Sequence, residues 1–191
     1  MDYIITALIS YLFGSIPFGY IFTKIFLKKD IRNVGSGNIG ATNVLRTGNK
    51  RLGYLTLILD IIKAVIPVIY IKLFFSELIF ISALSAFLGH LFPVWLKFDG
   101  GKGVATYVGI LISIDIYYAL IFGIIWILTF IISKYSSLSS LIASISIPIY
   151  ILILSNGNFI FFTIMFVLIF YTHRENIKRL INKEETKSKI Y

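Results

Sequence analysis

Two glycine-rich segments carry side chains suited to binding phosphate. The first spans residues 35–46 and reads GSGNIGATNVLR. Glycines let backbone N–H groups turn toward an anion, and hydroxyl, amide and guanidinium groups donate hydrogen bonds to its oxygens. This pattern predicts a site for a phosphate or an acyl oxygen, and a flexible surface loop is the alternative. The candidate contacts are Ser36, Gly37, Asn38, Thr42, Asn43 and Arg46.

The second segment, residues 97–106, reads KFDGGKGVAT and leads into an apolar run. A glycine-rich turn at a helix N-terminus is a ready anion site, because its N–H groups and the positive end of the helix dipole face the ligand. Lys102 adds a point charge, and Gly100, Gly101 and Gly103 are its glycines. The pattern favours a phosphate site over a simple turn.

Two nucleotide-binding motifs are excluded. Gly35, Gly37 and Gly40 match G-x-G-x-x-G, but that motif belongs to a strand–helix–strand unit, whereas apolar runs of membrane length flank this segment. A Walker A motif fails at Lys102, because Gly103 stands where Ser or Thr would hold magnesium. We therefore expect neither dinucleotide binding nor nucleotide hydrolysis.

A third candidate segment follows the last apolar run. His173 and Asn176 would share one face of a continuing helix, because they are three residues apart. A histidine at this place can act as an acid, a base or a hydrogen-bond donor to phosphate. The alternative is a basic anchor for anionic headgroups, which is our interpretation of Lys178 and Arg179.

The elements that position these residues are membrane helices. Of the 191 residues, 58% are hydrophobic and only 14% are charged, and the mean hydropathy is +0.89. This composition excludes a water-soluble globular protein. The net charge of +9 would suit nucleic acid, but the Lys and Arg residues stand between apolar runs, which indicates membrane topology. Disulfides and cysteine nucleophiles are excluded, because the chain has no cysteine.

We predict an all-α, polytopic integral membrane protein with about seven transmembrane helices, forming one domain over residues 1–191. Joining residues 104–132 and 138–171 would leave five spans, but it places Lys134 outside and needs a helix of 34 residues. A single span requires about 20 helical residues, so residues 104–114 are too short to cross alone. The seven runs are 3–26, 52–71, 78–95, 104–114, 117–132, 138–154 and 159–171.

Basic residues predict the orientation of these helices. With the N-terminus outside, fifteen Lys and Arg residues fall in inside segments and only Lys72 falls in an outside segment. The N-terminus is therefore predicted outside and the C-terminus in the cytoplasm. This orientation places residues 35–46, 99–106 and 173–176 on the cytoplasmic side, where we expect a single site with one edge open to lipid.

Residues inside the spans predict helix contacts. Asp60 and Lys63 are three residues apart and are expected to neutralise each other. His90 is expected to be buried about 8 Å below the inner end of its helix and to order the turn 97–103. Rows of small residues spaced four apart, at 6, 10 and 14 and at 82 and 86, predict close helix packing.

Six blocks of this chain resemble the bacterial acyl-phosphate:glycerol-3-phosphate acyltransferases, the PlsY family. They run in the family's order and read GSIPFG (14–19), SGNIGATN (36–43), LDIIK (59–63), GHLFPVW (89–95), GGKGVAT (100–106) and HRENI (173–177). A weaker block, residues 134–140, begins with Lys134 where the family usually has Arg. It leaves the choice between Ser137 and Ser140 as a site residue open.

The resemblance implies an enzyme of phospholipid synthesis. It would transfer a fatty acyl group from acyl phosphate to the 1-hydroxyl of sn-glycerol 3-phosphate, giving lysophosphatidic acid and phosphate. We expect no cofactor, no metal and no nucleic acid, and a monomer acting in the bacterial cytoplasmic membrane. The second glycine-rich motif would hold the glycerol phosphate, with Ser137 as a further substrate contact. The site would be lined by Ser36, Asn38, Arg46, Lys102, His173 and Asn176.

The expected mechanism is direct transfer. Acyl phosphate is already activated, so the protein must chiefly orient two anions and stabilise charge, a task suited to Arg46 and Lys102. The proton of the acceptor hydroxyl would pass to His173 or to the substrate's own phosphate, with Asn176 orienting one of them. Neither histidine is followed five residues later by Asp, and no Ser–His–carboxylate triad is evident. An acyl-Ser36 intermediate is the less favoured alternative.

Two other classes compete with this interpretation. A transporter or channel for phosphate-bearing solutes would explain Asp60 and Lys63 within a span. The outer segments 72–77 and 155–158 are short and carry no motif, which disfavours a transport path. A lipid phosphatase is the second alternative, while the lack of acidic clusters disfavours a magnesium-dependent phosphotransferase.

Overall fold

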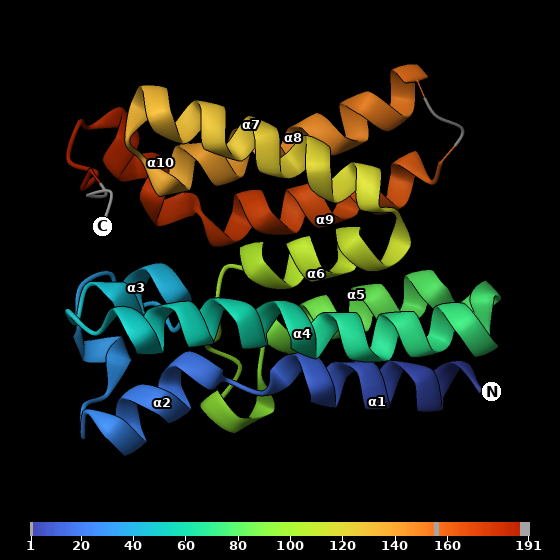
Figure 1. The fold of residues 1–191 in the computed structure, drawn as a ribbon, viewed down its shortest axis with the longest axis horizontal. Coiled ribbons are helices and arrows are strands. Elements are labelled where there is room, and N and C mark those ends of the chain that lie inside the picture. The colour runs from blue at the N-terminus through green and yellow to red at the C-terminus, as the bar shows by residue number, and fades with distance from the viewer. Residues whose placement is uncertain (1, 155–156, 188–191) are drawn as a thin grey trace. The chain divides into compact units, whose positions relative to one another are not determined.

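The computed structural model describes residues 2–154 and 157–187. Within these residues the regular structure is helical and contains no strand (Figure 1). The chain divides into two compact units, Met1–Ile114 and Asp115–Tyr191. The all-α fold class predicted from the sequence is therefore confirmed.

The described part of unit 1 contains six α-helices and three short 3₁₀ turns. The helix α4 includes the predicted run 52–71, and α6 coincides with the predicted run 104–114. The helix α1 packs on α5, and α4 packs on α6. In chain order the elements are α1 (Tyr3–Ser15), α2 (Phe18–Phe26), η1 (Ile31–Asn33), α3 (Ala41–Leu45), α4 (Lys50–Phe74), η2 (Ser76–Leu78), α5 (Ile79–Leu91), η3 (Val94–Leu96) and α6 (Val104–Ile114).

Small residues bring α1 and α5 into close contact. A Cβ added at Gly14 would overlap the carbonyl oxygen of Ala86. The hydroxyls of Ser10 and Ser82 form a buried hydrogen bond of 2.9 Å. The predicted packing through rows of small residues is confirmed here. Such contacts matter in a membrane protein, because lipid provides little hydrophobic drive for helix association.

The first predicted span is broken between α1 and α2. Helix α1 ends at Ser15, and α2 begins at Phe18 after Ile16 and Pro17. Proline has no N–H to donate, so it interrupts the helical hydrogen bonds. The ammonium of Lys63, from α4, donates to the Ile16 carbonyl at 2.7 Å. A buried side chain from a neighbouring helix therefore stabilises the break.

Unit 2, within its described residues, contains α7 (Ile116–Ser133), α8 (Ser136–Leu154), α9 (Phe159–Thr172) and α10 (Arg174–Ile181). Helix α8 packs on both α7 and α9. The predicted runs 117–132, 138–154 and 159–171 match α7, α8 and α9 to within two residues at each end. Part of the predicted outer segment 155–158 lies outside the described residues.

Four segments of the described chain have the length and apolar composition of a membrane span. A fifth is added if α9 and α10, which meet at a bend of 62°, count as one. The joined helices of the five-span alternative do not form, because α6 ends at Ile114 and α8 ends at Leu154. The total of seven spans and the N-out orientation stay predictions. The four segments are Tyr3–Phe26, Ser76–Leu96, Ile116–Ser133 and Ser136–Leu154.

Candidate active site

The buried side chain of Asn43 organises the first glycine-rich segment. Its Nδ2 donates to the carbonyl oxygens of Val34 and Asn38, both at 2.8 Å, and to that of Ile31 at 3.2 Å. Its Oδ1 accepts a hydrogen bond from the N–H of Ser36 at 3.0 Å. Both ends of the amide are thus engaged, and only 2% of the residue is exposed. In this structure Asn43 shapes the loop from within.

The glycines of this segment permit a tight turn around Asn43. Gly35 and Gly37 have φ angles of +57° and +73°, a region that favours glycine. A Cβ at Gly35 would overlap Oδ1 of Asn43. The N–H of Gly40 donates to the side-chain oxygen of Asn38 at 2.9 Å. The glycines that matched a dinucleotide motif are therefore explained by the backbone conformation of this turn and by the space that Asn43 needs.

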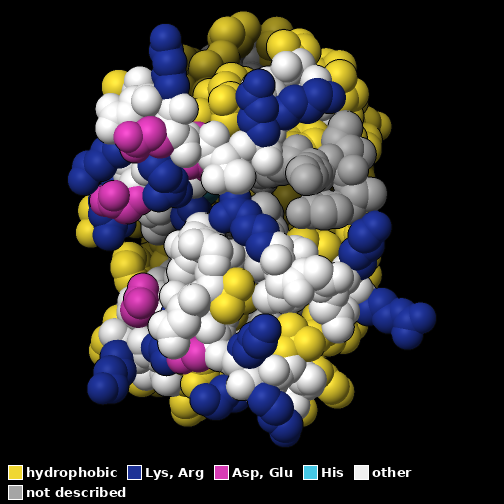
Figure 2. All heavy atoms as spheres, turned by 90° about the vertical axis from the view of Figure 1, so that its left-hand side faces the viewer, with side chains coloured by type: hydrophobic (Ala, Val, Ile, Leu, Met, Phe, Trp, Pro, Cys, Tyr) yellow, Lys and Arg dark blue, Asp and Glu magenta, His cyan; other side chains and the backbone are white. Residues whose placement is uncertain are grey.

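The loop presents three of its predicted site residues toward the surface. Ser36 and Thr42 are exposed, and Arg46 is half-buried at the end of α3. The aliphatic part of Arg46 lies beside Gly35, since a Cβ there would be 3.2 Å from Arg46 Cδ. The structure thus brings Arg46 next to the backbone that carries Ser36. The face drawn in Figure 2, which includes the α3 end of unit 1, carries many Lys and Arg side chains.

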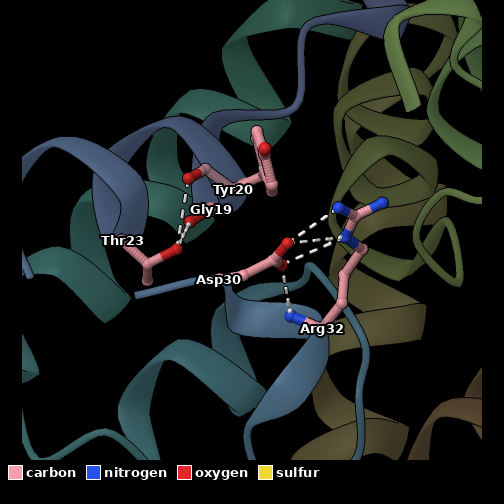
Figure 3. Close-up of polar contacts among 5 residues, drawn as sticks. All are labelled: Gly19, Tyr20, Thr23, Asp30 and Arg32. Atoms are coloured by element: carbon pink, nitrogen blue, oxygen red, sulfur yellow. Dashed lines mark hydrogen bonds and ion pairs between the residues drawn. The ribbon is translucent and has the colours of Figure 1, made fainter. Parts of the chain in front are cut away.

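An ion pair fixes the start of this loop after α2. The carboxylate of Asp30 lies 2.7 Å from Arg32 Nη2 and also accepts the N–H of Arg32 at 3.0 Å (Figure 3). The hydrogen bonds from the Arg32 side chain lower the pKa of Asp30 to about 2. The Arg32 guanidinium also lies over the ring of Tyr20, 5.1 Å from its centre. Arg32 is therefore engaged in shaping the loop.

The second glycine-rich segment is built on the C-terminal turn of α5. The N–H of Gly100 donates to the Leu91 carbonyl at 3.1 Å, and the N–H of Gly101 donates to the His90 carbonyl at 3.0 Å. A helix end leaves such carbonyls without helical partners, so the loop satisfies them. A Cβ at Gly101 would overlap the His90 imidazole, and Gly100 also lies against this turn. These two glycines let the loop lie close against the end of α5, and their N–H groups donate to carbonyls of α5, so they are not directed at a ligand.

The part of this loop that can face an anion therefore begins at residue 102. Lys102 is half-buried, and α6 begins at Val104. The first turn of α6 contributes the positive end of its dipole there. Gly103 has φ of +83° and packs against Phe87, so its conformation and its space both require glycine.

The predicted pairing of Asp60 with Lys63 is confirmed. Lys63 Nζ lies 2.7 Å from Asp60 Oδ1, and both side chains are almost fully buried. His90 is buried as predicted, with 3% of the residue exposed. Its Nδ1 lies 3.9 Å from Asp60 Oδ1. These groups lie within unit 1, behind the second loop.

In unit 2, His173 stands at the bend between α9 and α10. The residue is 2% exposed, and its Nδ1 lies 2.8 Å from the Ile169 carbonyl oxygen. Because a carbonyl can only accept, Nδ1 carries the proton, and in the neutral form of the ring Nε2 has the lone pair. This tautomer suits a proton acceptor.

Asn176 and Ser137 converge on the carboxylate of Glu185. Asn176 Nδ2 donates to Glu185 Oε1 at 2.7 Å, and Ser137 Oγ donates to the same oxygen at 2.9 Å. Arg179 Nε donates to Oε2 at 2.7 Å. Burial acts to raise the pKa of Glu185, but the hydrogen bonds from these three side chains outweigh it and hold the pKa below its ordinary value. Two predicted site residues are thus brought together.

Sequence reasoning missed Glu185. The chain turns back toward Asn176 after α10, where Lys183 adopts φ of +61°. The N–H of Glu184 donates to the Arg179 carbonyl at 2.8 Å, and that of Lys183 donates to Leu180 at 3.2 Å, which is a Schellman motif. Glycine or asparagine usually marks such a turn, and Lys183 carries no such signal.

The structure also separates the two candidate serines of α8. Ser140 donates to the Ser136 carbonyl at 2.9 Å and lies 3.1 Å from the indole nitrogen of Trp126, which donates to it. Ser137 instead shares the Glu185 carboxylate with Asn176. Ser137 is therefore the serine associated with the predicted site residues of unit 2.

Sequence comparison matches this chain to a known family of enzymes. The model of the glycerol-3-phosphate acyltransferase family matches residues 4–183. A curated glycerol-3-phosphate acyltransferase from Pelagibacter ubique is 71% identical over 191 residues, covering all of both chains. One from Rhodopseudomonas palustris strain HaA2 is 50% identical and covers 98% of this chain and 95% of the relative.

Two crystal structures of PlsY, described as an integral membrane glycerol 3-phosphate acyltransferase, share the fold. The glycerol 3-phosphate form has a TM-score of 0.92 and 37% identity, covering 98% of this chain and 96% of that one. The lysophosphatidic acid form has a TM-score of 0.88 and 35% identity, with coverage of 98% and 95%. The agreement extends along almost the whole chain in both sequence and fold, so this chain belongs to the PlsY family of integral membrane glycerol-3-phosphate acyltransferases.

Proposed function

We propose that this chain transfers a fatty acyl group from acyl phosphate to the 1-hydroxyl of sn-glycerol 3-phosphate. The products are 1-acyl-sn-glycerol 3-phosphate and inorganic phosphate, and the pathway is phospholipid biosynthesis. The observation that supports this function most strongly is the full-length match to a glycerol-3-phosphate acyltransferase at 71% identity. The glycerol 3-phosphate and lysophosphatidic acid forms of the solved relative support the substrate and product.

The positive charge for the two anionic substrates is assigned to the two glycine-rich loops. Arg46 and Lys102 are the proposed charge-stabilising residues, and Ser36 is the proposed hydrogen-bond donor on the first loop. Gly37, Asn38 and Thr42 complete the proposed contacts of that loop, with Asn43 acting through its shape. This assignment is supported by the exposure of Ser36 and Thr42 and by the position of Arg46 beside Gly35.

The second loop holds the phosphate of glycerol 3-phosphate. Lys102 and the first turn of α6 make the direct contacts in this proposal. Gly100, Gly101 and Gly103 allow the loop to lie against α5, which is supported by the overlaps that a Cβ would create at each. Fixed donors of this kind stabilise charge at no further cost in ordering.

The acid and base chemistry is assigned to residues of the third predicted segment, 173–176. The acceptor hydroxyl oxygen attacks the acyl carbonyl carbon, the bond from that carbon to the phosphate oxygen breaks, and phosphate leaves. The hydroxyl proton passes to Nε2 of His173 or to the phosphate of the substrate. Asn176 orients this group, and Ser137 is a further proposed substrate contact through its hydroxyl oxygen, since its hydroxyl proton is directed to Glu185. The Nδ1 contact of His173 with Ile169 supports the required tautomer.

An apolar hollow in unit 1 suits the acyl chain. It has a volume of about 300 Å³ and lies beside the break between α1 and α2. Tyr20 connects it to Arg32 of the first loop, and Leu96 directly precedes the second loop. A chain seated there would have its phosphate end near both loops of this unit. The lining residues are Ile16, Pro17, Tyr20, Ile21, Trp95 and Leu96.

The oligomeric state and the membrane location of the enzyme are also proposed. It acts as a monomer, and residues 1–191 serve as one functional domain. The enzyme resides in the bacterial cytoplasmic membrane with its reacting groups facing the cytoplasm. The bias of Lys and Arg toward one set of loops supports this orientation.

The test uses purified protein with glycerol 3-phosphate and, separately, acyl phosphate or acyl-CoA. We expect lysophosphatidate from acyl phosphate alone. His173→Ala and Lys102→Ala should each lose activity without loss of folded yield, while Lys97→Ala, an exposed lysine of the same loop, should keep it. Solute flux in vesicles without acylation would instead support a transporter, and near-normal turnover of both variants would overturn the site.

A quench experiment separates direct transfer from an acyl-enzyme. The protein is mixed with radiolabelled acyl phosphate, denatured within the turnover time and freed of lipid. Direct transfer predicts no label on the chain, with or without glycerol 3-phosphate. Label that disappears in Ser36→Ala would establish an acyl-serine intermediate and overturn direct transfer.

A further inference from the structure

A chain of buried polar groups links the break in the first span to the second glycine-rich loop. The Ile16 carbonyl accepts from Lys63 Nζ at 2.7 Å, and the same ammonium lies 2.7 Å from Asp60 Oδ1. His90 follows, with Nδ1 at 3.9 Å from Asp60 Oδ1. The three side chains are each at most 3% exposed. A buried ion pair next to a buried imidazole is costly, which calls for an explanation.

His90 is in contact with the loop through both its backbone and its side chain. Its carbonyl accepts the N–H of Gly101 at 3.0 Å. Nε2 of its imidazole occupies the space where a Cβ of Gly101 would be, so the ring forms the surface on which Gly101 rests. Lys102 is the next residue. The position of the ring therefore determines where the backbone before Lys102 can lie.

The imidazole itself is incompletely satisfied. Within the described residues, Nδ1 of His90 has no hydrogen-bond partner although it is buried. The 3.9 Å to Asp60 exceeds a hydrogen bond, which requires roughly 3.2 Å or less. A movement of the His90 ring by less than about 1 Å would bring Nδ1 within hydrogen-bond distance of Asp60 Oδ1. Buried polar groups in native proteins are nearly always paired, so an open contact of this kind favours a functional explanation over simple packing.

We propose that His90 is a positioning residue for the phosphate-binding loop, anchored by the Asp60–Lys63 pair. When the loop holds the phosphate of glycerol 3-phosphate, the ring moves with Gly101 and its Nδ1–H closes onto Asp60. The closed hydrogen bond then stabilises the bound form of the loop. This inference rests on the proposed function, because it takes the loop at Lys102 as the glycerol phosphate site.

His90 acts through the loop and does not touch the substrate in this proposal. Its loss should therefore weaken glycerol 3-phosphate binding and leave the chemical step intact. The effect should be specific to this substrate, because acyl phosphate binding depends on the first loop and the apolar hollow. A purely structural role would instead reduce stability and affect both substrates alike.

Steady-state kinetics of two His90 variants test the proposal. His90→Phe keeps a planar ring but removes the donor, and His90→Asn keeps a donor near the position of Nδ1. For His90→Phe we expect the KM for glycerol 3-phosphate to rise about tenfold, with kcat within about twofold. His90→Asn should restore most of the lost affinity, and the KM for acyl phosphate should be unchanged in both.

Ser82→Ala is the matched control. It removes a buried hydrogen bond of 2.9 Å on the same helix, away from the loop. We expect it to lower thermal stability while the KM for glycerol 3-phosphate stays at the wild-type value. An unchanged KM in His90→Phe, or equal defects in His90→Phe and His90→Asn, would overturn the positioning role.

A second route covers the case in which His90→Phe does not fold. The double variant Asp60→Asn/Lys63→Met removes the pair without leaving one buried charge alone. It should raise the KM for glycerol 3-phosphate as His90→Phe does, and reduce the thermal stabilisation that added glycerol 3-phosphate provides. Wild-type values for both would overturn the anchoring role of the pair.

Lys102→Ala distinguishes failure of this inference from failure of the proposed function. If Lys102→Ala loses glycerol 3-phosphate binding while the His90 and Asp60/Lys63 variants keep it, the loop binds phosphate and the positioning role fails. If Lys102→Ala also binds glycerol 3-phosphate normally, the loop is not the phosphate site, and both proposals fail.

Discussion

The side-chain oxygen of Asn43 holds the backbone N–H of Ser36 at 3.0 Å. Asn43 Nδ2 meanwhile donates to three loop carbonyls, those of Ile31, Val34 and Asn38. One buried amide thus fixes the backbone on both sides of an exposed serine. Such a contact orients Ser36 without touching the substrate.

Asn43→Ala should therefore reduce activity through Ser36. It removes four hydrogen bonds, of which the one to the Ile31 carbonyl is buried and the others are partly buried; a fully buried group left without a partner costs about 1–3 kcal/mol. We expect kcat/KM to fall by about two orders of magnitude, with a lower thermal midpoint. Asn33→Ala, an exposed position in η1 just before this segment, should leave both unchanged. Equal activity of the two variants would contradict a loop-shaping role for Asn43.

Gly101→Ala should raise the KM for glycerol 3-phosphate. The added Cβ would overlap the His90 ring, so the loop must move away from α5 and carry Lys102 with it. We expect an increase of about tenfold or more, measured by lysophosphatidate formation at varied glycerol 3-phosphate. Gly123→Ala is the matched control, because no described residue lies within 4 Å of a Cβ at that helical position. A similar response of both variants would refute the contact with His90.

Acid should release the segment after α10 by protonating Glu185. Burial raises its pKa, but the hydrogen bonds from Arg179, Asn176 and Ser137 together outweigh burial and hold the pKa in the folded protein below the ordinary 4.5. The stabilisation is therefore complete above the pKa of the unfolded state and is lost as pH falls through the lower folded value. Hydrogen exchange of residues 176–187, corrected for intrinsic rates, should accelerate below about pH 4.5.

Glu185→Gln tests the same contact at neutral pH. The variant loses the ion pair with Arg179, so its exchange should be fast at every pH and activity should fall because Asn176 and Ser137 lose their common partner. Glu184→Gln is the control, since Glu184 is exposed. If Glu184→Gln and Glu185→Gln show the same exchange rates and the same activity, the contacts of Asn176 and Ser137 with Glu185 do not contribute to function.

Filling the apolar hollow should change the preference for acyl-chain length. Ile21 lines the hollow, and Ile21→Trp would occupy part of its roughly 300 Å³. We expect kcat/KM for long-chain acyl phosphate to fall about tenfold relative to a short-chain donor, with the KM for glycerol 3-phosphate unchanged. Ile25→Trp on the exposed side of α2 should show no such change. An unaltered ratio in Ile21→Trp would place the acyl chain elsewhere.

Much of the fold was predictable because a helix that crosses the membrane must be apolar over its whole length, so the apolar runs of the sequence mark the helices. The predicted run 104–114 is α6, and the runs of unit 2 match α7, α8 and α9 closely. The break at Pro17 was not predicted, because a proline inside an apolar run is compatible with a continuous span. It depends on Lys63, which donates to the Ile16 carbonyl from another helix.

The candidate site was only partly predictable for the same reason. Residue types and spacing identified the two glycine-rich loops and the pairing of Asp60 with Lys63, since these are local in sequence. They did not reveal that the amides of Gly100 and Gly101 bind the end of α5. Nor did they reveal Glu185, whose partner Ser137 is 48 residues away.

The sequence by itself thus determined the membrane class, the helix runs and the chemical types gathered in each loop, because these depend on composition and short-range spacing. Only the tertiary structure decided which donors face outward and which are used within the protein. That division depends on hydrogen bonds between distant segments, such as Ser36 with Asn43 and Asn176 with Glu185, and a pattern of residue types does not encode such pairings.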